Sequence, residues 1–366
     1  MKLVFTSYSS SPEYTEPDVW LERINAYTGI LENLSFNNTT IGIERIDYEG
    51  EYEQNGVHYF FIKLKNKVVR FPWRMHKLIK KLKADVVFVN GFIFPFQIIQ
   101  LRLALGRSVK IIVLHRAEKP FNGPKKHLQQ LADKCVNAYL FTSAEFGEQW
   151  IKNGNIKRQE KIHEVIQASS VFFPGNQLQA RAELSVTGLP VFLWVGRLDT
   201  NKDPITVVKA FIRLLRSHPN AKLYMIYQTE ELLQDVKRLV EANASAKDAI
   251  RLIGKVPHLQ LQKWYNAADF IISSSHYEGS GVAVCEAMSC GCIPIVTNIV
   301  SFRRMTGPGK CGLLYKPGNT EALLNTLVYA IQMDLECESK KVLQQFQAEL
   351  SFQAIATKIN SIILSL

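Results

Sequence analysis

Short apolar runs alternate with amphipathic stretches along most of the chain. The apolar runs predict buried strands, and the recurrence of apolar residues at helical spacing between them predicts helices. In the first half, this pattern predicts strands at 2–6, 41–47, 58–64, 86–90, 109–114 and 138–142. It predicts helices at 17–34, 72–82, 95–105, 125–134 and 144–153. Three of these helices open with proline, whose missing N–H costs nothing in a first turn.

A second alternating series follows a looser stretch at 174–190, where we place a domain boundary. Its predicted strands are 191–195, 222–226, 250–253, 270–273, 293–297 and 312–315. Its predicted helices are 204–217, 230–242 and a tail at 339–366. The first of these opens at Asp203-Pro204. Strands that alternate with helices predict an α/β fold with parallel sheets covered on both faces. We therefore expect two doubly wound, Rossmann-like domains, 1–180 and 186–340.

The stretch with the most candidate chemistry runs from Ala267 to Asn298. Its pattern predicts a strand, a loop with two glycines and an acid, a helix and a second strand, at 270–273, 274–281, 282–289 and 293–297. This layout aims backbone N–H groups and a helix N-terminus at an anion. Glu278 in the loop and Glu286 in the helix are expected to face one crevice at the carboxyl end of the sheet.

The sequence E-G-S-G at 278–281, followed by Glu286 and by A-M-S-C-G-C-I-P-I-V at 287–296, resembles the nucleotide-sugar signature of the retaining family 4 glycosyltransferases. Two glycines alone would be weak evidence, because short turns use the same residues. The resemblance implies a GT-B fold, in which two domains face a central cleft. It also implies a donor-binding second domain and a C-terminal helix, 345–366, that packs back on the first domain.

The same resemblance assigns roles to the residues of this stretch. It places Glu286 on the ribose hydroxyls of the donor. It places Glu278 beside the donor sugar, where a carboxylate can hold a hydroxyl or stabilise positive charge at the anomeric carbon. The backbone N–H groups that it directs toward the sugar or phosphate belong to Gly279, Ser280, Gly281 and Val282.

Two cations follow the first strand of the second domain, where open α/β sheets form ligand crevices. Gly196-Arg197-Leu198, with Lys202 five residues after Arg197, is similar to the family's phosphate-binding pair. Arginine forks onto phosphate oxygens and lysine acts as a point charge, although either cation alone would fit a solvated turn. The sequence contains no Asp-x-Asp motif. The resemblance therefore implies no metal and no cofactor besides the nucleotide-diphosphate sugar, which is a co-substrate.

Two further matches are weaker. Val256-Pro257 follows a strand and resembles the segment that lines the nucleobase site. His115 directly follows the strand predicted at 109–114. It resembles the family's active-site histidine beside the donor sugar, although a lone histidine is more often structural. Departures from the family include the first loop, 6–13, which lacks glycine, and residues 226–229, which replace the usual G-x-G. These departures put in doubt how the first loop meets the donor.

Composition supports a globular protein of two domains, with 366 residues, of which 47% are hydrophobic and 21% charged. The six cysteines complete no zinc-binding spacing, and we expect them to be reduced and buried. The longest apolar stretch, 92–105, contains Pro95 and Arg102, and 1–10 is too short for a signal peptide. These features predict a cytoplasmic protein.

The formal net charge of +11 has a local source at 61–83, which holds nine basic residues and no acidic one. Within it, 72–83 predicts a basic amphipathic helix suited to an anionic membrane surface on the inner face of the cell membrane. Docking of the same apolar stripe on the domain's own sheet is the alternative. We expect no nucleic-acid partner.

Together these features predict a metal-independent, retaining hexosyltransferase. It would move a sugar from a nucleotide-diphosphate donor to a sugar or lipid-linked acceptor, in surface polysaccharide or glycolipid synthesis. Two alternatives stay open. One is an inactive donor-binding or scaffold subunit, and the other is a nucleotide-sugar epimerase or phosphorylase of the same fold.

Overall fold

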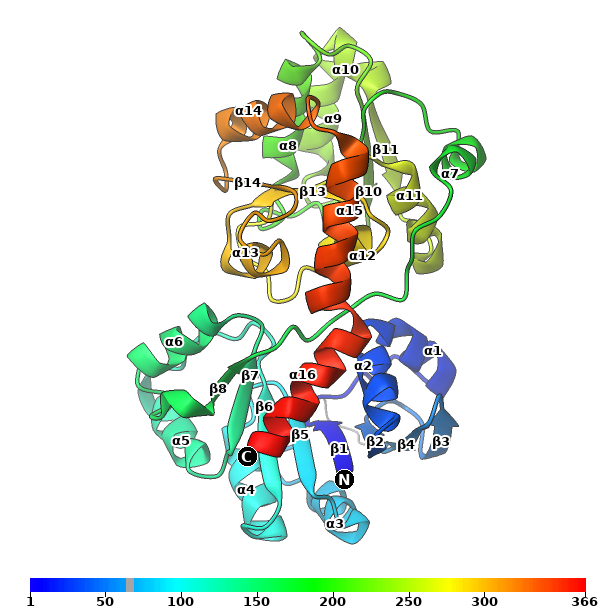
Figure 1. Cartoon of the computed structure of the whole chain (residues 1–366). Helices are drawn as coiled ribbons and strands as arrows, with labels where there is room; N and C mark the ends of the chain where they lie inside the picture. The colour runs from blue at the N-terminus through cyan, green and yellow to red at the C-terminus, as the bar shows by residue number, and fades with distance from the viewer. Residues whose placement is uncertain (64–68) are drawn as a thin grey trace. The chain divides into compact units, whose positions relative to one another are not determined.

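The computed structural model describes residues 1–63 and 69–366 (Figure 1). The chain divides into two compact units, Met1–Ser169 together with Phe352–Leu366, and Ser170–Ser351. Each unit is a mainly parallel sheet flanked by helices, so the predicted α/β, doubly wound architecture is confirmed.

In the part of the first unit that the structure describes, eight strands form a sheet in the order β3-β4-β2-β1-β5-β6-β7-β8, and of these only β3 runs antiparallel to its neighbour. The strands are β1 (Lys2–Ser7), β2 (Thr39–Glu44), β3 (Gly50–Gln54), β4 (Val57–Phe61), β5 (Val86–Asn90), β6 (Lys110–Leu114), β7 (Ala138–Phe141) and β8 (Ile162–Glu164). The sequence did not predict β3 and β8, and Leu64 of the strand predicted at 58–64 lies outside the described residues. Asn55 and Gly56, with φ of 50° and 77°, form the tight turn between β3 and β4.

Among the described residues of this unit, seven α-helices accompany the sheet: α1 (Pro17–Arg23), α2 (Asn25–Ser35), α3 (Trp73–Leu82), α4 (Pro95–Leu105), α5 (Gly123–Asp133), α6 (Ala144–Lys152) and α16 (Phe352–Ser365). The single helix predicted at 17–34 is in fact two helices. The backbone leaves the helical region at Ile24, where φ is −107° and ψ is 20°. The other predicted helices of this unit lie within a few residues of their expected bounds.

The second unit has a six-stranded parallel sheet in the order β11-β10-β9-β12-β13-β14. The strands are β9 (Val191–Gly196), β10 (Lys222–Tyr227), β11 (Ile250–Gly254), β12 (Phe270–Ser273), β13 (Ile293–Thr297) and β14 (Leu313–Tyr315). The helices are α7 (Gln177–Leu184), α8 (Pro204–Leu214), α9 (Leu233–Glu241), α10 (Ala244–Ala249), α11 (Leu261–Ala267), α12 (Val282–Ser289), α13 (Val300–Met305), α14 (Thr320–Ala330) and α15 (Leu335–Gln345). Every strand predicted for this half is present.

The stretch 174–190, which the sequence placed between the domains, lies inside the second unit. The Gly175 N–H donates to Asn266 Oδ1 at 2.6 Å, and Arg181 Nη2 donates to Asp269 Oδ2 at 2.8 Å. These bonds attach the stretch to α11 and to the start of β12, so the division between the units falls earlier, at Ser169.

Four of the six cysteines are buried, and burial raises the pKa of Cys290 and of Cys311 to about 12. The expectation of burial is wrong for the other two. Cys337 is exposed, and Cys135 is partly exposed at the end of α5. None of the six, all of which lie in the described part of the chain, is in a disulfide.

The C-terminal tail is not one helix, because an extended residue, Ser351, with ψ of 151°, separates α16 from the turn 346–350. Within the first unit α16 packs against α2. Asn38 Nδ2 donates to Asn360 Oδ1 at 3.1 Å, and Gly29 of α2 lies against the ring of Phe352. A Cβ on Gly29 would lie 2.6 Å from that ring, which is far inside van der Waals contact.

This contact predicts the effect of Gly29→Ala. Alanine normally favours a helix interior over glycine by about 1 kcal/mol, but overpacking costs about 1–3 kcal/mol. We expect Gly29→Ala to lower the free energy of unfolding in urea denaturation, against the sign of helix propensity. In a Phe352→Ala background the same substitution should become neutral or stabilising. An equal loss in both backgrounds would show that Phe352 is not the cause.

Candidate functional site

The loop after β9 holds the two predicted cations. Gly196 ends the strand, and Arg197 and Lys202 follow before α8 begins. Asp199 organises this loop, because its Oδ1 accepts from the Lys202 N–H at 2.9 Å and its Oδ2 lies 3.1 Å from Arg197 Nη2. The Arg197 side chain is 59% exposed, so its ion pair with Asp199 is weak and its guanidinium is available to a ligand.

Lys202 reaches from this loop to the loop after β12. Its Nζ forms an ion pair with Glu278 Oε1, and both side chains are largely buried. Ser274 Oγ donates to Lys202 O at 2.5 Å, and Asn201 Nδ2 donates to Tyr277 O at 3.0 Å. The structure thus brings two predicted residues, Lys202 and Glu278, into direct contact.

The position of this contact in the sheet is typical of ligand crevices. From β9 the chain proceeds to β10 and β11 on one side, whereas β12, which pairs with the other side of β9, leads to β13 and β14. The order reverses between β9 and β12, and open α/β sheets bind ligands outside the carboxyl ends of the strands at such a point. The loops that carry Lys202 and Glu278 follow these two strands.

Gly281 fixes the start of α12 beside this contact. Its φ is 52°, and a Cβ at this position would lie 2.7 Å from the Phe302 ring, so no other residue fits without rearrangement. Gly279 and Ser280, which precede it, are half-buried, and Val282 is exposed. The first N–H groups of a helix lack intrahelical partners and carry the positive end of its dipole. This helix start can therefore bind an anion.

Glu286, in the middle of α12, is buried, and both of its carboxylate oxygens have partners. Oε1 lies 2.6 Å from His258 Nε2, and Oε2 accepts from the Tyr265 hydroxyl at 2.9 Å. Burial, followed by the charge of Glu286, raises the pKa of Tyr265 well above 10, so Tyr265 keeps its proton and donates. The ribose contact of Glu286 stays a prediction. In the free protein the two carboxylate oxygens are in contact with His258 and Tyr265.

His258 and Tyr265 are the partners that the sequence analysis missed. His258 directly follows the predicted Val256-Pro257 segment, in which Val256 is half-buried and Pro257 exposed. The imidazole is 41% exposed, and its ring centroid lies 5.0 Å from that of Phe172. The predicted nucleobase segment therefore leads directly to the Glu286 carboxylate.

His115 belongs to the first unit and lies in its core, 2% exposed. Aromatic rings surround it, with the centroids of Phe141 at 4.8 Å and Phe92 at 5.3 Å. Nε2 lies 2.7 Å from Glu118 O, to which it donates, and burial lowers the pKa of His115, which favours the neutral ring. This placement is that of a structural histidine, and a contact with the donor sugar stays a prediction.

Polar groups also lie at the carboxyl edge of the first unit's sheet, and the sequence analysis missed one of them, Glu44. Glu44 ends β2 and accepts from Trp20 Nε1 at 3.0 Å, and burial raises the pKa of Glu44 to about 7. Arg116 Nη2 donates to Asn90 Oδ1 at 2.9 Å and stacks over Tyr27, with its guanidinium carbon 5.2 Å from the ring centroid. Glu44 ends a strand, which is the signal that could have identified it.

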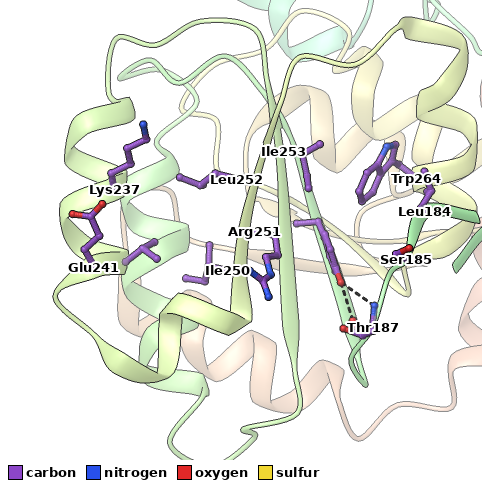
Figure 2. Close-up of a pocket in the computed structure, with 12 residues that line it drawn as sticks. Leu184, Ser185, Thr187, Lys237, Glu241, Ile250, Arg251, Leu252, Ile253 and Trp264 are labelled. Atoms are coloured by element: carbon purple, nitrogen blue, oxygen red, sulfur yellow. Dashed lines mark hydrogen bonds between the residues drawn. The ribbon is translucent and has the colours of Figure 1, made fainter. Parts of the chain in front are cut away.

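The second unit also contains a cavity of about 750 Å³ beside its edge strand β11 (Figure 2). Residues of α7, α9 and α11 line it, among them Trp264, Lys237 and Glu241. It includes none of the predicted site residues. No group of three or more His, Cys, Asp or Glu within residues 1–63 and 69–366 is placed to hold a metal ion.

The second unit is thus a doubly wound α/β domain with cations and a helix start at its topological switch point, as in domains that bind nucleotides. Residues 176–345 match the family model described as Glycosyl transferases group 1. The predicted resemblance is therefore confirmed, and the second unit carries a glycosyl transferases group 1 domain.

Curated relatives agree with this family. A GDP-mannose:cellobiosyl-diphosphopolyprenol alpha-mannosyltransferase of Komagataeibacter xylinus is 28% identical over 145 residues, 39% of this chain and 37% of that protein. A D-inositol 3-phosphate glycosyltransferase of Frankia alni is 28% identical over 151 residues, again 39% and 37%. The matched region thus spans 37% of the length of either relative. A mannosyltransferase with the first name, from Xanthomonas campestris, is 25% identical over 266 residues, 70% of this chain and 68% of that one.

Solved structures show the fold of the whole chain. A glycosyltransferase from Rickettsia africae superposes with a TM-score of 0.75 at 18% identity, covering 100% of this chain and 98% of the other. HepE from Anabaena, solved in complex with UDP and glucose, has a TM-score of 0.70 at 13% identity and is covered completely. The fold is that of GT-B glycosyltransferases, as predicted.

Proposed function

We propose that this protein is a retaining glycosyltransferase that transfers a hexose from a nucleotide-diphosphate donor without a metal ion. One observation carries the proposal. Lys202 is held against Glu278 at the topological switch point, beside the exposed Arg197 and the open start of α12. Cations and free N–H groups suit a diphosphate, and carboxylates suit the hydroxyls of a sugar and a ribose. The site places both kinds of group at one edge of the sheet.

The cations would act on the leaving group. When the bond between the anomeric carbon and the diphosphate breaks, the electron pair leaves with the phosphate oxygen, and negative charge grows there. Arg197, Lys202 and the N–H groups at the start of α12 would stabilise that charge in place of a divalent cation. The acceptor oxygen forms the new bond to the anomeric carbon, and its proton passes to the departing phosphate oxygen.

The free site already contains a carboxylate for each cation, Asp199 for Arg197 and Glu278 for Lys202. A bound diphosphate would therefore compete for both cations. Once Lys202 turns to the phosphate, Glu278 is released to hold a sugar hydroxyl or to stabilise positive charge at the anomeric carbon. Donor binding would therefore itself release Glu278 from Lys202 for its role at the sugar.

Glu286 would bind the ribose. The buried Tyr265 hydroxyl would go on donating to Oε2. The ribose hydroxyls would donate to Oε1, which in the free protein lies beside the more exposed His258. Val256 and Pro257 lead into this position and would border the nucleobase.

For the acceptor we propose a sugar or a lipid-linked sugar, as in surface polysaccharide or glycolipid synthesis. The support comes from the relative named as acting on cellobiosyl-diphosphopolyprenol and from the relatives named for D-inositol 3-phosphate.

The first test concerns the diphosphate. We expect Arg197→Ala to lower kcat/KM about a hundredfold, as loss of one donor to a developing oxyanion does. The assay is donor hydrolysis or transfer across a panel of nucleotide sugars. Arg216→Ala, an exposed arginine of the same unit, is the matched control and should leave activity unchanged. Activity that disappears in EDTA and returns with magnesium or manganese would contradict the metal-free reaction.

The second test separates the two carboxylates. Glu286→Ala should weaken binding of the nucleoside diphosphate itself, since the ribose contact is present without the sugar. Glu278→Ala should preserve nucleotide affinity and slow the chemical step, because its proposed contacts are with the sugar. Calorimetry with the nucleoside diphosphate measures the first effect, and single-turnover kinetics the second. Equal losses of affinity in both variants would show that the roles are assigned wrongly.

The proposed membrane contact rests on the outer face of α3. Met75 and Ile79 are fully buried, so the apolar stripe of this helix docks on its own unit, which was the alternative interpretation. Phe71 and Trp73 are exposed at the start of the helix, and its lysines face solvent. None of the described helices has the length and apolar character needed to cross a bilayer. An anionic surface would therefore meet aromatic rings and lysines, and not the stripe.

We expect substitution of the four exposed lysines by glutamine to reduce sedimentation with anionic vesicles sharply, because each contributes about 1 kcal/mol near such a surface. These residues are Lys77, Lys80, Lys81 and Lys83. Four exposed lysines elsewhere, changed in the same way, give a control with the same net charge, namely Lys152, Lys209, Lys247 and Lys316. Equal sedimentation of both variants, or no vesicle binding by the unmodified protein at low salt, would contradict this contact.

A further inference from the structure

We propose a second anion site, at the amino edge of the first unit's sheet, which binds a phosphate-bearing ligand. A cavity of about 810 Å³ lies there, at the end of the sheet opposite to the strand ends that carry Glu44 and Asn90. Five cationic side chains and one acidic side chain are among its lining residues: Arg102, Arg107, Lys134, Arg158, Lys161 and Glu160. No part of the proposed transfer reaction uses these residues.

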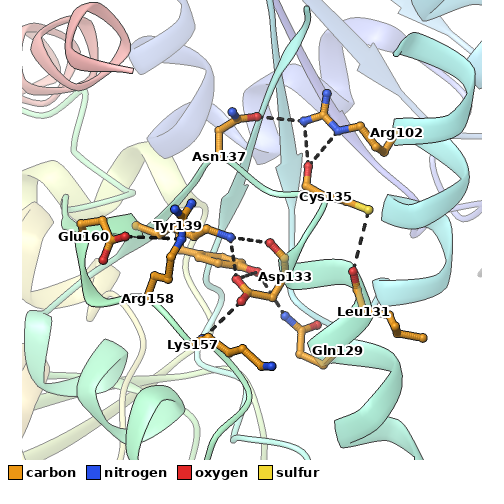
Figure 3. Close-up of polar contacts among 11 residues, drawn as sticks. Arg102, Gln129, Leu131, Asp133, Cys135, Asn137, Tyr139, Lys157, Arg158 and Glu160 are labelled. Atoms are coloured by element: carbon orange, nitrogen blue, oxygen red, sulfur yellow. Dashed lines mark hydrogen bonds and ion pairs between the residues drawn. The ribbon is translucent and has the colours of Figure 1, made fainter. Parts of the chain in front are cut away.

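Arg102 provides a fixed positive charge in this pocket (Figure 3). Its Nε and Nη2 donate to Cys135 O at 3.0 Å and 2.7 Å, and its Nη2 also donates to Asn137 Oδ1 at 2.8 Å. Its Nη1 donates to the carbonyls of Gly106 and Val109. These five hydrogen bonds end on four neutral acceptors, so they orient the guanidinium without cancelling its charge. Burial lowers the pKa of Arg102, but an arginine stays protonated at neutral pH.

The buried acid near the pocket is fully occupied. Asp133 Oδ1 lies 3.0 Å from Lys161 Nζ and accepts from the Tyr139 hydroxyl at 3.1 Å. Its Oδ2 accepts from the Lys157 N–H at 3.2 Å. Asp133 therefore balances Lys161 and does not compensate the other cations of the lining.

The remaining cations are on the surface of the pocket. Arg107 and Lys134 are exposed, and neither has an ion pair within the part of the chain that the structure describes. Arg158 lies 3.3 Å from Glu160, but both side chains are more than half exposed, so this pair is weak. Lys110, at the start of β6, donates to Leu366 O at 2.8 Å. The pocket thus holds a surplus of positive charge.

Helix dipoles explain only part of this charge. The carbonyl ends of α4 and α5 lie at this edge and favour Arg107 and Lys134 nearby. Arg158 and Lys161 come six and nine residues after the end of α6 at Lys152, so neither belongs to the last turn of that helix. Several guanidinium and ammonium groups that converge on one cavity fit the oxygens of a phosphate or diphosphate. Such a ligand comes either from the headgroup of an anionic phospholipid or from a soluble phosphate ester.

Cys135 allows binding to be measured at this site alone. It lines the pocket and is partly exposed, whereas the other thiols are buried except for Cys337, which belongs to the second unit. We would alkylate the protein at neutral pH and follow both cysteines by peptide mass spectrometry, with Cys337 as the internal reference. Inorganic pyrophosphate and vesicles that contain phosphatidylglycerol are the two probes. Arg197 belongs to the second unit, so protection of Cys135 that persists in Arg197→Ala reports on this pocket and not on the proposed donor site.

At a pyrophosphate concentration about five times its Kd, mass action leaves roughly one-sixth of the sites open, so alkylation of Cys135 should slow about sixfold relative to Cys337. The protection should weaken as salt is added. Protection by pyrophosphate indicates a soluble phosphate ester as the source, and protection by vesicles alone indicates a lipid headgroup.

The decisive variant combines Arg107→Gln, Lys134→Gln and Arg158→Gln, which are exposed side chains whose loss should leave the fold intact. We expect it to abolish protection of Cys135. The control Lys152→Gln, Lys209→Gln, Lys247→Gln has the same net charge and should be protected like the unmodified protein. Unchanged alkylation of Cys135 with both probes, or equal protection in the two triple variants, would overturn the proposal.

Discussion

The ion pair between Lys202 and Glu278 is the interaction on which the candidate site depends. It joins two loops that are 76 residues apart in sequence and adjacent in space, because β9 and β12 pair at the point where strand order reverses. The pair is largely buried, so removing one partner alone would leave an uncompensated charge with little water around it. A bound diphosphate would replace Glu278 as the negative partner of Lys202, so the lysine would not be left as an uncompensated buried charge. The geometry that stabilises the free loop therefore also prepares it for a dianionic ligand.

The central strands of the second unit, β9, β10, β12 and β13, were predictable because each is largely buried and parallel, which leaves a continuous apolar run in the sequence. β3 escaped prediction because its residues, Gly50–Gln54, alternate between exposed and half-buried and are mostly polar. The turn that forms it was visible as Asn55-Gly56, a strong hairpin signal. The boundary was placed late because bonds such as Gly175 to Asn266 link segments distant in sequence.

The same limit applies to the site. Arg197, Lys202, Glu278 and Glu286 could be named because they stand in short motifs at strand ends. Their partners could not, since Tyr265 and His258 reach Glu286 from 21 and 28 residues away through tertiary packing. His115 shows the converse. Its place at the end of β6 follows from the pattern, but its enclosure by Phe92, Phe141 and Trp150 depends on three other elements. Local sequence determines position along a strand, whereas burial is a property of the assembled unit.

Parallel α/β topology gives the two edges of a sheet different means of binding anions. At the carboxyl edge helices begin, and backbone N–H groups such as those that follow Gly281 contribute binding that does not depend on ionisation. At the amino edge helices end, and their exposed carbonyls repel an anion, so an anion site there must rely on side-chain charge. The pocket around Arg102 has this character, with backbone carbonyls oriented onto the guanidinium and exposed cations at its rim. Binding at such a site should depend steeply on ionic strength, whereas binding at the start of α12 should depend on it less.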